Sequence, residues 1–195
     1  MKRLFVLMGF VALFCSGLAL ADNAATQPAA APAALTGIRA EVLQNMNYAA
    51  DKLMQLADAT PAEKFAWRPA EGVRSISEVY VHVAGANYLL AQILGKKPPV
   101  PFDEKDEKTI TEKSKVIANL KQSMDYLNKL VSDIPDSDLD KEIDYFGRKS
   151  TIRGALFGFA SHMHEHLGQS IAYARMNGIV PPWTAKEQQE EHKSH

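Results

Sequence analysis

Three histidines lie at alternate positions within five residues near the carboxyl end of the chain, at His162, His164 and His166. Closely spaced imidazoles can bind a divalent metal, transfer protons, or serve as polar groups on a helix surface. On an α-helix, residues four apart face the same way, whereas residues two apart are turned about 200° from each other. His162 and His166 therefore form a pair on one face, and we expect His164 to point elsewhere.

A further histidine, His82, lies on an earlier segment that also has helical periodicity. Its spacing from Val79 and Ala86 predicts that it lies on the buried side of that helix. A buried imidazole needs a partner for each nitrogen, and packing of the two helices would bring His82 close to the pair. Three neutral imidazoles at one point can bind a divalent transition metal and leave positions for water or substrate. The alternative is that each histidine bonds separately to a nearby carbonyl.

Several residues close to these histidines in sequence are candidates for the surroundings of the site. Gln169, three residues beyond the pair, could orient a ligand or a bound water, or it could pack as a simple helix amide. Asn87 and Tyr88 follow the early histidine by five and six residues and are further candidates for a pocket. Glu165 lies between the paired histidines, but its helical phase predicts a solvent-exposed carboxylate rather than a general base.

Four segments in which apolar residues recur every three or four positions must position these side chains. Ser75 and Glu78 form a capping box at the start of the second segment. The links of about 59–74 and 135–149 are long enough for short helical turns, and a short extended piece is expected around 144–146. The pattern predicts an all-α four-helix bundle. The expected helices span about 36 to 58, Ser75 to Gly95, Ile117 to Val131, and Ser150 or Thr151 to about Met176.

The two ends of the chain differ from the helical part. Residues 1–21 have a basic start, an apolar run and a small-x-small site at their end, which predicts a secretory signal peptide. The alternative is an uncleaved membrane anchor. An Ala/Pro-rich linker over 22–35 follows, then the bundle over 36–184 and a charged tail over 185–195 that we expect to fray. We therefore expect an exported, periplasmic protein.

Composition argues against several classes of function. The formal net charge of the full chain is −1, and loss of Lys2 and Arg3 with the signal lowers it to −3. The mature chain has no basic stripe for nucleic acid and no second apolar span for a membrane. The single cysteine, Cys15, also lies in the signal segment, so the mature chain has neither a disulfide nor a thiol nucleophile.

The segments HVAGANYLLAQILG and HMHEHLGQSIAYARMNGIVPP resemble the DinB/YfiT-like family of bacterial four-helix proteins. The resemblance covers about Gly37 to Trp183, and its most specific part is the His-x-x-x-His-x-Gly-Gln run with the double proline that follows. It implies the same four-helix fold that the apolar periodicity predicts.

The resemblance also implies a metal triad of one histidine from the second helix and a pair from the last, which fall on His82, His162 and His166. Family members often carry arginine where this chain has Leu167, so a charge at the rim of the site is missing here. Some relatives are thought to use low-molecular-weight thiols. That chemistry suits an exported protein poorly, because it would meet little reduced thiol.

Two hypotheses of function follow from these patterns. The first is a metal-dependent hydrolase or transferase that acts on a small molecule and uses zinc or nickel, or else iron, because neutral nitrogen ligands do not choose among these ions. The second is an exported metal-binding or interaction protein without catalytic activity, which could form a homodimer through a helix face. Three protein ligands and an open position favour catalysis, whereas a fourth protein ligand favours a structural metal.

Overall fold

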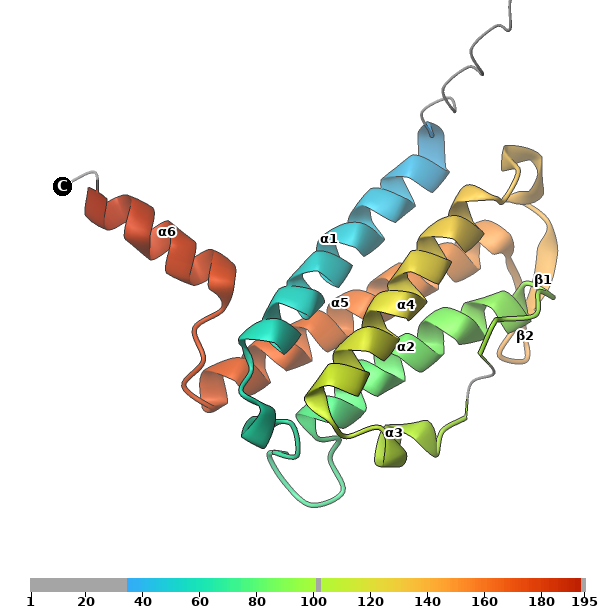
Figure 1. Ribbon diagram of the computed structural model, residues 1–195. Helices are drawn as coiled ribbons and strands as arrows, with labels where there is room; N and C mark the ends of the chain where they lie inside the picture. Colours follow the sequence, from blue (N-terminus) through green and yellow to red (C-terminus); the bar gives the residue numbers. More distant parts are fainter. Residues whose placement is uncertain (1–34, 101–102, 194–195) are drawn as a thin grey trace, which may run out of the picture. The chain divides into compact units, whose positions relative to one another are not determined.

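The computed structural model of the protein describes residues 35–100 and 103–193. The expected signal peptide and almost all of the expected linker lie outside the described residues. In the part of the chain that is described, none of the helices has both the length and the apolarity that a membrane crossing requires. Four long helices make up most of this part (Figure 1).

The long helices match the four predicted segments, and the all-α four-helix bundle is confirmed. They are α1 (Gly37–Ala59), α2 (Ile76–Ile93), α4 (Lys113–Ser132) and α5 (Ile152–Met176). Shorter elements occupy the links and the carboxyl end. They are η1 (Ala62–Lys64), α3 (Asp106–Thr109), η2 (Asp136–Asp138), β1 (Glu142–Tyr145), β2 (Arg148–Thr151) and α6 (Pro182–Lys193).

The helices pack in an order that differs from their order in the chain. α1 contacts α4 and α5, and α2 contacts the same two helices, so α1 and α2 occupy opposite corners of the bundle. α1 and α5 run in one direction and α2 and α4 run in the other (Figure 1). The long link between α1 and α2 spans the diagonal. The contact between α2 and α5 places the helix of His82 against the helix of His162 and His166.

α2 is buried around most of its circumference. Helices α4 and α5, the short α3 and strand β1 all contact it. A helix covered on several sides needs apolar residues on several faces, which explains why Val79, Val81 and Val83 are all buried. The remaining core comes from apolar stripes of α1, α4 and α5, with fully buried residues that include Leu53, Leu56, Leu120 and Leu156.

The capping box at the start of α2 is formed as the sequence predicts. The Glu78 backbone N–H donates to the Ser75 hydroxyl at 3.3 Å, and the Ser75 N–H donates to the Glu78 carboxylate at 2.8 Å. Arg68 and Lys108 each contact the same carboxylate at 3.0 Å. The start of α2 is therefore joined both to the link that precedes it and to α3.

The link before α5 contains a β-hairpin, where the sequence predicts only a short extended piece. β1 and β2 pair antiparallel with Tyr145 opposite Arg148, and Phe146 and Gly147 form the turn. Both turn residues have positive φ, 54° and 77°, as a type I′ turn requires. Such turns usually contain Asn-Gly or Gly-Gly, so a phenylalanine at the first position conceals the hairpin in the sequence.

The carboxyl end also differs from the expectation of a fraying tail over 185–195. Its described part continues as α6, which begins at Pro182, where the missing N–H of proline leaves no helix hydrogen bond unmade. No residue of α6 is buried. Lys52 of α1 lies over the Trp183 ring, with Nζ 3.9 Å from the ring centroid, and this cation–π contact joins α6 to α1.

We expect Ser75→Ala to lower the free energy of unfolding by about 1 kcal/mol, because α2 then loses its N-cap. Urea denaturation of both proteins measures this difference. Ser161→Ala is the matched control: Ser161 is exposed on α5, and its replacement should change stability by less than about 0.5 kcal/mol. Equal losses in the two variants would show that the cap contributes nothing particular.

Candidate metal centre

The structure brings the three predicted histidines to one point. His82 Nε2 lies 3.0 Å from His162 Nε2, and His166 Nε2 lies 3.1 Å from the same atom. His82 projects from α2, and the other two come from consecutive turns of α5. One nitrogen from each ring lies within 4.8 Å of the others, so the three histidines form a group that could hold a metal ion.

The far side of the His82 ring faces a carboxylate. Its Nδ1 lies 2.7 Å from Glu107 Oε1, and Arg74 binds the same carboxylate through Nε at 2.7 Å and Nη2 at 3.3 Å. Burial alone would raise the pKa of the Glu107 carboxyl, but hydrogen bonds from Arg74 and His82 hold that pKa below its usual range. An ionised carboxylate only accepts, so Nδ1 of His82 carries a proton, and in the neutral ring Nε2 then presents a lone pair.

A chain of hydrogen bonds fixes His166 in the same sense. Its Nδ1 lies 2.8 Å from Gln169 Oε1, Gln169 Nε2 lies 2.9 Å from the Tyr173 hydroxyl, and that hydroxyl lies 3.2 Å from the Arg74 carbonyl oxygen. Because a carbonyl oxygen only accepts, the Tyr173 hydroxyl donates to it and accepts from the Gln169 amide. The amide oxygen then accepts from Nδ1 of His166, whose Nε2 is left unprotonated.

The converging nitrogens suit a cation. Two of the three Nε2 atoms present lone pairs to the common point, and only His162 is able to keep a proton there. Nitrogens bound to one ion at about 2.1 Å are roughly 3.0–3.4 Å apart. The His162 nitrogen lies at 3.0 and 3.1 Å from those of His82 and His166, and the three ligand atoms lie within 4.8 Å of one another. The residues present therefore fit a divalent transition metal, which would displace the proton of His162 to its other nitrogen.

The surroundings keep two of the three imidazoles, those of His162 and His166, neutral. Burial lowers the pKa of His162 to about 4, with smaller contributions from His166, His82 and Arg74. Burial also lowers the pKa of His166, although its hydrogen bond to Gln169 acts in the opposite direction. Both rings are neutral at pH 7, which is the form that binds metals.

Asn87 and Tyr88 lie away from the site, and this corrects their expected place in a pocket. They are turned about 140° and 240° from His82 around the helix axis. Asn87 Nδ2 donates to Ser123 Oγ at 3.0 Å on α4, and the Tyr88 ring lies 5.6 Å from that of Tyr126. Neither residue lines the cavity beside the histidines.

The neighbours of the pair on α5 behave as their helical phase predicts, with one difference. His164 points away, with Nδ1 3.0 Å from the Ala160 carbonyl oxygen and its ring stacked on Tyr48. Glu165 is exposed. Leu167 is buried in the core rather than placed at the rim of the site, so no rim charge is expected from this position.

Sequence reasoning missed Glu107 and Arg74. Glu107 belongs to the charged run DEKDEKT, which looks like a solvated loop, and α3 is too short to show a helical period. Arg74 lies in the link before α2, and its partner Glu107 lies on α3, which contacts that helix. No local pattern marks either residue.

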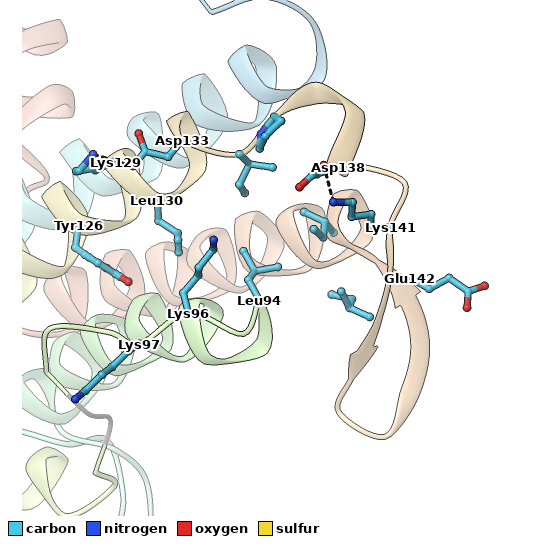
Figure 2. Close-up of a pocket in the computed structure, with 14 residues that line it drawn as sticks. Leu94, Lys96, Lys97, Tyr126, Lys129, Leu130, Asp133, Asp138, Lys141 and Glu142 are labelled. Atoms are coloured by element: carbon cyan, nitrogen blue, oxygen red, sulfur yellow. Dashed lines mark hydrogen bonds and ion pairs between the residues drawn. The ribbon is translucent and has the colours of Figure 1, made fainter.

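A cavity of about 250 Å³ opens beside two of the three histidines. Its lining is Arg74, His82, Ala86, Leu89, Glu104, Glu107, Tyr145, Phe146, Phe159 and His162. A separate hollow of about 570 Å³ lies where the ends of α2 and α4 meet β1 (Figure 2). No histidine lines that hollow, and ion pairs occupy two of its lysines, Lys129 with Asp133 and Lys141 with Asp138.

We expect the metal-free protein to lose stability as pH falls from 7 to 5. The pKa of His162 is about 4 in the folded chain against an ordinary value of 6.5, so the unfolded chain binds more protons in this range. The stabilisation is complete above pH 6.5 and decreases towards pH 4. Melting temperatures of chelator-treated protein should show a weaker pH dependence for His162→Gln than for wild type. His164→Gln is the control and should keep the wild-type dependence; equal slopes in all three proteins would contradict the prediction.

Comparison with known proteins places this arrangement in a family. A family model described as the DinB superfamily matches residues 45–170, which include all three histidines. YjoA of Bacillus subtilis strain 168 is 30% identical over 130 residues, which are 64% of this chain and 80% of YjoA.

Solved structures share the fold. A DinB-like protein from Bacillus cereus ATCC 10987 has a TM-score of 0.64 and 22% identity, over 72% of this chain and 93% of that protein. YfiT from Bacillus subtilis, described as a probable metal-dependent hydrolase with an unusual four-helix bundle topology, has a TM-score of 0.59 and 19% identity, over 76% of this chain and 93% of YfiT. With the family match over most of the bundle, the resemblance read from the sequence is confirmed: the chain belongs to the DinB superfamily.

Proposed function

We propose that this protein is a metal-dependent hydrolase of a small molecule and holds one divalent ion, zinc or nickel or else iron, through His82, His162 and His166. The observation that carries the proposal is the convergence of three imidazole Nε2 atoms. In two of the rings the partner of Nδ1 holds the proton there, which leaves Nε2 free to bind an ion. The description of YfiT, a relative in fold, as a probable metal-dependent hydrolase supports the reaction class.

The number of ligands supports catalysis over a structural metal. Among the residues that the structure describes, the cluster has three members, whereas closed structural sites have four protein ligands. Glu107 is engaged by Nδ1 of His82 and by Arg74, so it orients a ligand rather than completing the set. The cavity beside the histidines leaves room for a substrate at the open side.

When bound there, a divalent metal supplies a Lewis acid that lowers the pKa of water and polarises a substrate oxygen. The protein contributes position. Glu107 and Gln169 hold two imidazole rings in the orientation and tautomer that metal binding needs. Tyr145 and Phe159, two of the aromatic side chains of the cavity, provide a largely apolar wall beside the reacting group.

We expect one metal ion per chain in zinc-loaded, dialysed wild type and none in His162→Ala. Hydrolysis of a panel of small esters and amides should depend on the metal and fall to the buffer rate in His162→Ala, because the remaining two imidazoles do not hold the ion. Elemental analysis and the hydrolysis assay are made on the same samples. His164→Ala removes an imidazole from the same helix that points away, and it should retain both metal and activity.

Two outcomes would contradict the proposal. Wild type that stays metal-free after loading with zinc, nickel and iron would leave three separately bonded histidines and no metal centre. Wild type that binds one equivalent and hydrolyses nothing in the panel would instead be a metal-binding protein without catalytic activity.

We expect Glu107→Gln to weaken zinc binding by about 10- to 100-fold, because a neutral amide polarises the Nδ1–H of His82 less than a carboxylate does and makes that imidazole a weaker ligand. Competition with a chromophoric chelator measures the affinity. Glu104→Gln removes a carboxylate three residues away that is exposed and lines the same cavity, and it is the matched control. Equal affinities in the two variants would mean that the contact to His82 does not tune the site.

A further inference from the structure

We propose that the substrate of this site is a carboxylic ester or amide with a single aromatic ring beside the group that is hydrolysed, and that Phe146 recognises the ring. A ring next to the reacting group matters only if the histidines hold a metal, so this substrate class rests on the proposed function. Four features of the cavity carry it: the conformation of Phe146, the series of rings behind it, the size of the space, and the charges on its wall.

The conformation of Phe146 is unfavourable for its residue type. It lies at the tip of the hairpin with φ of 54°, a left-handed value that a type I′ turn normally gives to Asn, Asp or Gly. The residue is 63% exposed, so core packing does not compensate for the strain. A strained, exposed aromatic residue on the wall of a cavity indicates a role in function rather than in stability.

A continuous series of rings joins Phe146 to the histidines. The centroid of the Tyr145 ring lies 4.8 Å from that of Phe146, in an edge-to-face arrangement, and 6.3 Å from that of Phe159. The ring centroids of Phe159 and His162 are 6.4 Å apart. The Tyr145 hydroxyl lies directly against Gly158 of α5, where any Cβ would overlap it. The hairpin is therefore seated on α5, and this seat fixes the place of Phe146 relative to the histidines.

The opposite wall and the volume limit the size of the ligand. Ala86 and Leu89 follow His82 by four and seven residues on α2 and present an apolar surface to the same space. A dry cavity of about 150 Å³ accommodates a benzene ring. The space of about 250 Å³ therefore matches one ring with a short reacting group.

The charges of the lining argue against a phosphate ester. Its charged residues are Arg74, Glu104 and Glu107, and Arg74 is already bonded to Glu107. A divalent ion at the histidines would attract a phosphate, but the other phosphate oxygens would lie near two carboxylates and find no unpaired guanidinium or ammonium group in the lining. An uncharged ester or amide avoids this repulsion, and its carbonyl oxygen can still face the histidines.

Two hydroxamates test the inference on the zinc-loaded protein. Benzohydroxamate and acetohydroxamate carry the same chelating group with and without a ring, so the ratio of their Kd values isolates the ring. Calorimetric titration of wild type should give a ratio of about tenfold in favour of benzohydroxamate. In Phe146→Asn we expect the ratio to fall to about threefold or less, with the Kd of acetohydroxamate unchanged, and in Phe146→Tyr to return to the wild-type value.

Melting temperature and a second aromatic position separate recognition from structure. Asparagine tolerates a positive φ, so Phe146→Asn should melt at the wild-type temperature or above it, whereas a structural phenylalanine would leave a less stable protein. Phe157 is also exposed, at 52%, and lies on α5 beside a different hollow. Phe157→Asn should keep the wild-type ratio of the two Kd values.

The outcomes are distinguishable. Equal binding of the two hydroxamates to wild type, or the same ratio in wild type and Phe146→Asn, would overturn the substrate class while leaving the metal centre intact. Failure of acetohydroxamate to bind zinc-loaded protein would mean that the ion has no open position, and the proposed hydrolase and its substrate class would fall together.

Discussion

Where α2 packs against α5, three imidazole rings meet inside the bundle, and two of them present lone pairs to the same point. This contact between helices is possible because α1 and α2 are not neighbours: each lies between α4 and α5, and the long link joins them across the diagonal. If consecutive helices were adjacent, α2 would pack against α1 and its histidine would lie away from α5. The convergence of the three histidines therefore depends on the order in which the helices pack.

The polar groups of the site are held inside an otherwise apolar helix pair. Unmade hydrogen bonds in such surroundings cost stability, and each outer nitrogen of His82 and His166 accordingly has a partner. Glu107, the partner of His82, lies on the short helix α3. Gln169, the partner of His166, lies on α5, the helix that also carries His166. The fold gives the outward nitrogens of His82 and His166 their partners, and the three inward nitrogens contact one another.

Much of this arrangement is readable from the sequence, because long amphipathic helices report their buried face locally. The spacing of His162 and His166 and the phase of His82 were sufficient to predict that they meet, and the capping box marked the start of α2. The role of Glu107 was not predictable, since only tertiary contacts order a four-residue helix within a charged run. The hairpin was not predictable because its turn contains a phenylalanine where such turns usually have asparagine or glycine. Asn87 and Tyr88 failed for a simpler reason: proximity in sequence to His82 was given more weight than their phase around the helix.

Arg74 takes part in both outer contacts of the histidines. Its guanidinium binds the carboxylate that faces His82, and its backbone carbonyl accepts from the tyrosine that ends the chain from His166. The orientation of two imidazoles from different helices thus depends on a single residue just before α2. A displacement of the Arg74 backbone would therefore shift the partners of both rings. The conformation of the link between α1 and α2 and the affinity of the three histidines for a cation are in this way thermodynamically coupled.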